Sequence, residues 1–521
     1  MRRFLSSFLA TPADRAGPAR LPLSLALATL AVMLASSVPF WTGPWLGMID
    51  YPSHLARYFV LARFEEFPAL AAHYRIHWAL LPNIGSDAVV IGLHAVTGWP
   101  TERISQVLVG LSATGLVPAA LLLNRALFGR WSWWPLASAV FVFNYVLLYG
   151  FLNYMAGVPL ALALAACWIL LREKPLALLV PLFGAGALIL FVVHLYAFAL
   201  YGLLILSHEL VMLAAARGAR LRLILRQAVA ALHVIPPFVL LFIFSPSSGS
   251  FAEGRIRWST LGDKALALYS VISMGVTEVT LATGVVVAGV LGLGLLLRRL
   301  AFAPSAAVML AALTVVFLVM PFTLFGLGFA DFRLPIVIAV VLVAGTTWRG
   351  LSPRAALLVA AAFAGITLLR VGVMTQEWER GNARYAAIMD VMGAMEPGRK
   401  MLAVMAREDA TARFQRRPPL DHAASFAIIT RQAFVPSFFA ESEKQPVNFA
   451  PEVAALGVHP PWSFALRDEG GRRALAAAAA PYDYLLLFAS APPADATPRG
   501  ARRMDDGSVP GVALFDLRPA R

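Results

Sequence analysis

Charged residues are scarce in this sequence, and their scarcity excludes a protein that is soluble throughout. Only 14% of the 521 residues are charged, whereas soluble domains have about 25%, and 59% are hydrophobic. The mean hydropathy is +0.73. Soluble cores alone cannot bury so much apolar surface, so the chain is predicted to be a polytopic membrane protein.

The few charges are also unevenly distributed. Residues 1–375 contain 25 Lys and Arg and 12 Asp and Glu, so about a tenth of their positions are charged. Residues 376–521 contain 18 and 17, about a quarter, which is an ordinary soluble fraction. We therefore predict a transmembrane domain over 1–375 and a small soluble domain over 376–521.

The sequence has a single cysteine and lacks the common cofactor motifs. The one cysteine, Cys167, lies in an apolar run, which excludes a disulfide and a cysteine metal site. There is no His-Glu-x-x-His, no Gly-x-Ser-x-Gly and no Gly-Lys-Ser/Thr. No cofactor or metal ligand is predicted, although a divalent cation is left open.

The net charge of +14 does not indicate a nucleic-acid partner. Residues 1–375 carry +13 of it, mostly in short loops between apolar stretches, and residues 376–521 carry +1. That distribution is typical of membrane topology rather than of a basic patch that binds phosphodiesters.

Apolar stretches long enough to cross a bilayer predict a mainly α fold, a bundle of about eleven transmembrane helices. The two least distinct divisions are 176–193 from 195–214 and 305–325 from 332–348. Pro39-Phe40-Trp41 follows the first stretch in place of a small-residue cleavage site, so that stretch is not predicted to be a cleaved signal. The eleven stretches are 22–41, 104–126, 132–150, 153–172, 176–193, 195–214, 227–245, 279–299, 305–325, 332–348 and 354–374.

Loop charges predict the orientation of these helices. With the N-terminus inside, the cytoplasmic segments hold sixteen cations and the longer outer loops hold eight. An odd number of spans then places the C-terminal domain outside. We predict a multi-pass protein of the bacterial inner membrane with a cytoplasmic N-terminus and a periplasmic C-terminal α/β domain. Nine of the twelve acids of 1–375 fall near the outer face, so acid–base chemistry is expected there.

The first outer loop, residues 42–103, is long enough to be functional. Leu55–Phe67 and Asp87–Val96 are predicted to be helices that lie in the membrane interface and cover an outer cleft. Asp50 stands where the first span meets this loop. It is predicted to be a general base, and the alternative is a helix cap before Pro52.

His54 and Arg57 follow Asp50 at helical spacing, so the three side chains are expected to share one face. For His54 and Arg57, substrate contact and an interfacial cluster with the charged ends in water remain equal alternatives.

This arrangement resembles the GT-C superfamily of membrane glycosyltransferases. The resemblance rests on the aspartate after the first span, the long first loop, about eleven spans and an outer C-terminal domain. Asp50–Arg57 followed by Trp78–Asn83 is similar to a bacterial branch of that superfamily. Tyr51 and Asn153 stand where related families have acids, which makes a metal-dependent site less expected.

The resemblance implies a polyprenyl-phosphate-linked sugar donor and a lipid, glycan or protein acceptor. It also implies inverting transfer at the outer leaflet with Asp50 as the base. A lipid or polysaccharide transporter and a non-catalytic scaffold remain the alternatives. The first would place ionisable groups throughout the spans, and the second is kept open by the missing acids.

Other polar residues are predicted to bind substrate around the cleft. Arginine offers a bidentate fork for a lipid phosphate, so Arg333 is the first candidate. The alternative for Arg333 is an ion pair with Asp331. For Arg255 and Arg257 the alternative is a loop that faces water or lipid headgroups. For His194 it is a hydrogen-bonded packing residue. The predicted substrate-binding residues are His54, Arg57, Asn83, Asp87, Asn153, His194, Arg255, Arg257 and Arg333.

The C-terminal region shows the pattern of a small α/β domain. Residues 376–395 are predicted to form a polar helix that leaves the membrane. Buried strands are predicted at Met401–Met405, Tyr484–Phe488 and Val512–Leu517, with a helix at Arg472–Ala480. Residues 416–462 are expected to be mostly loop and to shape the acceptor site.

Overall fold

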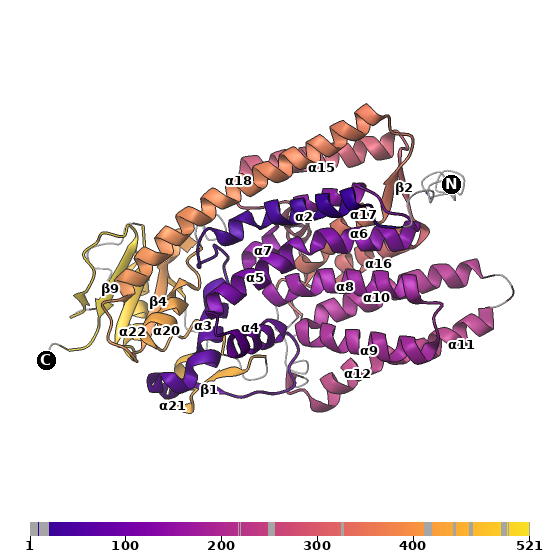
Figure 1. Cartoon of the computed structure of the whole chain (residues 1–521). Coiled ribbons are helices and arrows are strands. Elements are labelled where there is room, and N and C mark those ends of the chain that lie inside the picture. The colour runs from indigo at the N-terminus through magenta and orange to yellow at the C-terminus, as the bar shows by residue number, and fades with distance from the viewer. Residues whose placement is uncertain are drawn as a thin grey trace. The chain divides into compact units, whose positions relative to one another are not determined.

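The protein is mainly helical (Figure 1). Its chain divides into two compact units. The computed structural model describes residues 20–216, 220–247, 256–324, 328–410, 419–440, 444–457, 462–490 and 500–519, with Leu9, Gly218 and Pro498. Unit 1 comprises Met1–Phe40, Leu80–Ser86 and Val107–Met374, and unit 2 comprises Trp41–Ala79, Asp87–Gln106 and Thr375–Arg521. Because unit 2 also contains most of the first loop, the division into 1–375 and 376–521 stays a prediction.

Unit 1 consists mainly of helices, most of them apolar, and also contains a two-stranded antiparallel sheet of β2, Leu300–Phe302, and β3, Thr346–Trp348. The helices are α2 Leu23–Ser37, α6 Leu116–Phe128, α7 Tyr145–Tyr149, α8 Leu152–Leu171, α9 Leu176–Val193, α10 Leu195–Ala215, α11 Arg220–Ala230, α12 Ile235–Val239, α14 Leu261–Ser270, α15 Thr277–Leu296, α16 Pro304–Val319 and α17 Leu334–Ala344. The helix α5, Thr101–Thr114, leads into α6, and α18, Pro353–Met392, is continuous for 40 residues from the last apolar stretch into the predicted polar helix. Within the unit, α8 packs against α6, α9 and α10 (Figure 1).

Among the described residues, eight helices are long and apolar enough to cross a membrane. The predicted count of eleven is therefore not confirmed. Stretch 132–150 is broken into a 3₁₀ helix, Trp134–Phe141, and the short α7, because Asn144 is extended and caps α7. Stretch 305–325 gives only the 16 residues of α16, and 332–348 gives only the 11 of α17. The division between 176–193 and 195–214 is confirmed at His194, whose backbone is extended.

A buried arginine on α18 is a feature that the hydropathy pattern does not mark. Arg370 is 1% exposed. Its Nη1 donates to the Ile272 carbonyl (2.7 Å) and to Thr283 Oγ1 (2.9 Å), and its Nη2 donates to the Phe143 carbonyl. The guanidinium thus satisfies backbone oxygens where helices are interrupted, and it joins α15, α18 and the segment before α7.

Unit 2 contains a five-stranded mixed sheet in the order β6-β4-β7-β9-β8. Its strands are β4 Met401–Ala406, β6 Ser463–Phe464, β7 Tyr484–Phe488, β8 Arg502–Arg503 and β9 Val512–Asp516. β4 runs parallel to β6 and β7, while β9 is antiparallel to β7 and β8. All five residues of β7 are buried, as its unbroken apolar sequence requires of a central strand. The three predicted strands and the helix, α22 Glu469–Ala479, are confirmed.

The first-loop helices of the sequence analysis are also present. They are α3, Tyr51–Arg63, and α4, Gly85–Thr97. In α3 the ten residues Tyr51–Val60 are all buried, and α3 packs against α20, Phe426–Arg431. β1, Tyr74–Ile76, pairs antiparallel with β5, Val447–Phe449. Residues 416–462 therefore contain α20, β5 and the short helix α21, Pro451–Ala454, where mostly loop was expected.

Candidate functional site

Asp50 stands at the N-cap of α3 in unit 2, with Pro52 in the first turn. Asp50 thus has the helix-cap position that the sequence offered as its alternative. The side chain makes no capping hydrogen bond, although caps normally accept one from the first turn. It is 7% exposed, and its Oδ1 lies 3.5 Å from His422 Nε2. The carboxylate is thus directed at an imidazole.

His422 is held by Ser53 of α3 and by a backbone carbonyl. Its Nδ1 lies 3.1 Å from Ser53 Oγ and 3.2 Å from the Ser437 carbonyl oxygen. Ser53 Oγ is also 3.0 Å from Ser425 Oγ. Nδ1 faces a carbonyl and Nε2 faces a carboxylate, and both of these are acceptors.

Arg57 and Asp87 form a buried ion pair between α3 and α4. Arg57 is 3% exposed and Asp87 is fully buried. Arg57 Nε donates to Asp87 Oδ1 (2.5 Å) and Nη2 donates to Oδ2 (3.0 Å), the bidentate geometry of a strong charge-assisted pair. Burial alone would lower the pKa of Arg57, but the Asp87 carboxylate raises it above its usual value, with a smaller contribution from Asp50.

The prediction that His54 and Arg57 share a face of one helix is confirmed. Arg57 Nη2 lies 3.1 Å from His54 Nδ1, and Nη1 donates to Gln445 Oε1 of the C-terminal region. Phe439 packs between the two histidines, with its ring 6.0 Å from His54 and 4.8 Å from His422. Asp50, His54, Arg57 and Asp87 therefore belong to one polar cluster, which we call the Asp50 cluster together with Ser53 and His422.

Two predicted substrate-binding asparagines hold the backbone of unit 1. Asn83 has a positive φ of 65°, which asparagine tolerates better than most residues, and its Oδ1 accepts from the Leu195 backbone (2.9 Å). Asn153 Oδ1 accepts from the Ser86 backbone (2.7 Å), and its Nδ2 donates to the Asn83 carbonyl. Both side chains thus fasten residues 83–86 to the ends of α8 and α10.

His194 and Arg333 lie close to this point. His194 Nδ1 accepts from the Tyr196 backbone (3.1 Å) and so caps α10, and its ring packs 5.2 Å from that of Tyr154. The Tyr154 hydroxyl donates to the Arg333 carbonyl. The guanidinium of Arg333 lies over the rings of Phe151 (4.6 Å) and Tyr196 (5.0 Å). His194 therefore makes the hydrogen-bonded packing contacts that were its alternative and also caps α10, while its contact with substrate stays a prediction.

The alternative of an Arg333–Asp331 ion pair is wrong. Asp331 instead pairs with Lys264 Nζ (3.0 Å) and accepts from Ser259 Oγ (2.6 Å). Lys264 also donates to the Phe317 and Met320 carbonyls, both at 2.6 Å, where α16 ends and a cation is favoured. Within the described part of the chain, no carboxylate pairs with Arg333, although its side chain is 8% exposed. A buried arginine flanked by aromatic rings is suited to an anion.

Of the two predicted loop arginines, Arg255 and Arg257, the structure describes only Arg257. Arg257 is exposed and stacks on Phe322, 3.9 Å from the ring centroid. Arg255 lies outside the described residues. In the described ranges, no group of three His, Cys, Asp or Glu side chains is placed to hold a metal ion.

No pattern in the sequence predicted His422, Ser53 or Gln445 as part of the site. His422 is one of only two histidines after residue 375, and this was the one signal in the sequence that could have marked it. No local spacing links it to Asp50, because 372 positions separate them and the contact exists only in the folded unit.

No protein-family model matches the sequence, and a search of curated proteins gives no match. Solved structures of GT-C membrane glycosyltransferases are similar in fold at low identity. ArnT from Cupriavidus metallidurans bound to undecaprenyl phosphate has 14% identity and a TM-score of 0.49, with 95% of this chain and 98% of that chain covered. ArnT in the apo state has 15% identity and a TM-score of 0.44, with 79% and 88% covered.

The cryo-EM structure of the arabinofuranosyltransferase AftD from Mycobacteria has 14% identity and a TM-score of 0.48. It is matched over 98% of this chain but only 40% of its own length. The likeness to these proteins is one of fold, and no residue role in this chain follows from it.

The buried ion pair of the Asp50 cluster can be tested with two single variants and their combination. Arg57→Met or Asp87→Leu alone should destabilise the protein by about 3–5 kcal/mol, because each leaves an unpaired buried charge. The double variant should recover most of that loss. The measurement is the thermal denaturation midpoint of the purified protein in detergent.

Arg63→Met and Glu66→Leu provide the matched control, since that pair in the same loop is 40% and 53% exposed. Their effect should stay below about 1 kcal/mol. Equal losses for the buried and the exposed pair would contradict the assignment.

Proposed function

We propose that the protein is a glycosyltransferase that moves a sugar from a polyprenyl-phosphate-linked donor to an acceptor hydroxyl at the outer leaflet of the bacterial inner membrane. The observation that carries the proposal is the position of Asp50. Its carboxylate is almost fully buried at the head of α3, is not used as a helix cap and faces His422. A carboxylate placed in this way is suited to accept a proton in a partly dry site.

The proposed step is a single inverting displacement. The acceptor oxygen attacks the anomeric carbon and forms the new glycosidic bond. The bond between that carbon and the phosphate oxygen breaks, and its electron pair leaves with the polyprenyl phosphate. The proton of the acceptor hydroxyl passes to Asp50.

Asp50 suits this role better than Asp87, the other buried acid of the cluster. Both carboxylate oxygens of Asp87 accept hydrogen bonds from Arg57. Because the Arg57 guanidinium holds both oxygens in bidentate geometry, this carboxylate is already engaged and is poorly placed to take the proton of an acceptor hydroxyl. Arg57 and Asp87 therefore serve to fix α3, and with it the position of Asp50.

His422 is a positioning residue in this scheme. Its 3.5 Å separation from Asp50 is longer than an ordinary hydrogen bond, so the imidazole orients the carboxylate electrostatically rather than binding it tightly. Ser53 and the Ser437 carbonyl fix the ring through Nδ1.

The donor class comes from the family resemblance of the sequence. Undecaprenyl phosphate, which the ArnT structure contains, belongs to the same class of carrier. Arg333 remains the candidate for the donor phosphate, because its guanidinium is buried between Phe151 and Tyr196 and has no carboxylate partner among the described residues.

Asp50→Asn tests the proposal directly. The amide keeps the size of the side chain but cannot accept the proton, so sugar transfer should fall by about 10²- to 10⁴-fold with unchanged expression and thermal stability. The assay follows a radiolabelled sugar from a polyprenyl-phosphate donor into extracted acceptors. Glu65→Gln, an exposed acid of the same loop, is the control and should keep full activity. Wild-type transfer by Asp50→Asn would overturn the assignment.

His422→Ala should lower the turnover number about tenfold with little change in KM, because Asp50 loses its orienting partner. His422→Gln, which retains a polar group toward Asp50, should restore part of the rate. In the Asp50→Asn background His422→Ala should cause no further loss, since the histidine acts through Asp50. An equal loss in both backgrounds would show that His422 acts independently.

A further inference from the structure

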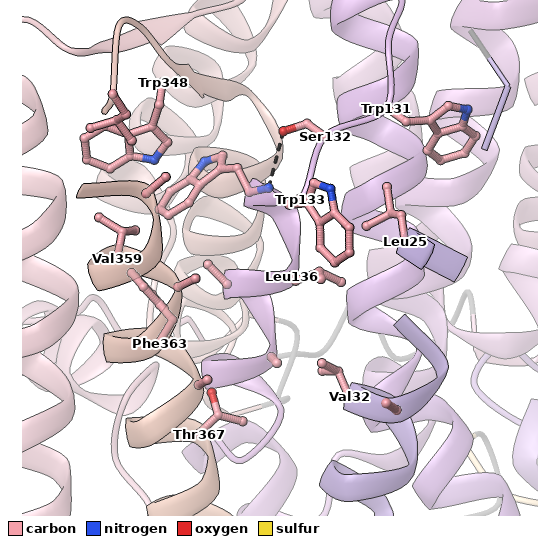
Figure 2. Close-up of a pocket in the computed structure, with 18 of the residues that line it drawn as sticks. Leu25, Val32, Trp131, Ser132, Trp133, Leu136, Trp348, Val359, Phe363 and Thr367 are labelled. Atoms are coloured by element: carbon pink, nitrogen blue, oxygen red, sulfur yellow. Dashed lines mark hydrogen bonds between the residues drawn. The ribbon is translucent and has the colours of Figure 1, made fainter. Parts of the chain in front are cut away.

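Unit 1 contains an apolar groove of about 870 Å³ between α2 and the first part of α18 (Figure 2). The 3₁₀ helix Trp134–Phe141 forms the wall between the two helices, and Leu136 projects from it. None of the residues proposed above for catalysis or donor binding lines this groove. Its volume lies within the range of ligand sites, about 300–1,000 Å³.

Small side chains keep the groove open. On α18, Ala356, Ala360 and Ala364 recur every four residues and therefore lie on one face of the helix. On α2, Ala31 and Ala35 line the opposite wall in the same way. A long chain of methylene groups can lie along these faces, whereas larger side chains would fill the space.

The length of the groove matches one leaflet of a bilayer. The lining residues of α2 run from Leu25 to Ser36 and those of α18 from Ala356 to Leu368. At 1.5 Å per residue these stretches are about 16–18 Å long. The hydrocarbon core of a bilayer is about 30 Å thick, so the groove accommodates an acyl chain of a single leaflet.

One end of the groove is aromatic and cationic. Trp131, Ser132, Trp133 and Trp348 gather there in Figure 2, and Arg130 belongs to the lining. Tryptophan is enriched at the level of lipid headgroups. Arg130 Nη2 donates to Thr347 Oγ1 (2.7 Å), which holds the guanidinium at this end.

The connections that meet at this end carry arginine and no acid. Segments 128–133, 297–303 and 345–354 contain five arginines and neither aspartate nor glutamate. Arg299 Nη1 donates to the Gly350 carbonyl (3.0 Å), and Gly350 itself lines the groove. The five arginines are Arg130, Arg298, Arg299, Arg349 and Arg354. Such a concentration of positive charge favours an anionic headgroup over a zwitterionic one.

We propose that this groove binds an anionic phospholipid, with one acyl chain between α2 and α18 and the phosphate beside Arg130. The loop charges of the sequence place this end at the cytoplasmic face, so the lipid would come from the inner leaflet. The charge selects an anionic headgroup, and the one-leaflet length selects an ordinary acyl chain over a longer polyprenyl carrier. The site is independent of the glycosyl transfer proposed above.

The test measures lipid retention by the purified full-length protein. The protein is stripped in detergent and incubated separately with dioleoyl phosphatidylglycerol, dioleoyl phosphatidylethanolamine and undecaprenyl phosphate, and bound lipid is counted by native mass spectrometry. Phosphatidylglycerol should bind at least about tenfold more tightly than phosphatidylethanolamine. Arg130→Gln should remove that preference, because it removes the positive charge that faces the lipid phosphate. Ala360→Trp should abolish binding of both phospholipids, because it fills the groove.

Two matched variants control for general damage. Arg222→Gln removes an exposed arginine of α11, and Ala361→Trp adds the same bulk to an exposed position of α18 that does not line the groove. Both should bind phosphatidylglycerol as the wild type does. The proposal is overturned if undecaprenyl phosphate binds more tightly, if no lipid shows a preference, or if the control variants lose binding equally.

Discussion

The buried pair of Arg57 and Asp87 is the interaction on which the candidate site depends. The helix α3 is buried along its first ten residues, and an arginine in the middle of such a helix requires a counter-charge. Asp87, from the first turns of α4, supplies it, and Gln445 takes a further guanidinium hydrogen. With α3 fixed in this way, Asp50 is fixed at its head. The same helix turns Ser53 toward His422 and His54 toward Phe439, so one ion pair orders both histidines of the cluster.

The sequence predicted the parts of the site that a single helix brings together. Asp50, His54 and Arg57 follow one another at helical spacing, and the structure places them in one cluster. The strands β4, β7 and β9 could also be predicted from the sequence, because each is an apolar run bounded by polar residues. Contacts between distant segments were not predictable. The pairing of Asp50 with His422, and of Asp331 with Lys264 instead of Arg333, depends on packing that no local pattern encodes.

In unit 1, hydropathy located the apolar stretches, but it did not predict which of them form helices long enough to cross a membrane. Three stretches of suitable composition are too short or too broken to count as spans, because Asn144 interrupts one and the helices of the other two end early. Arg370 lies in the last apolar stretch and is the kind of residue that a transporter would need. Its hydrogen bonds to Ile272, Thr283 and Phe143 assign it to the packing of interrupted helices, so it gives that alternative no support.

The proposed function requires a covalent step, and a product assay examines that step without any variant. The wild-type protein, purified in detergent, is incubated with a polyprenyl-phosphate-linked sugar and a lipid extract that contains acceptors, and free polyprenyl phosphate is quantified by mass spectrometry. Release that depends on protein, on acceptor and on time is the predicted result. A transporter or a scaffold would leave the donor intact, and an unchanged donor in an extract that supports transfer by a known enzyme would contradict the account.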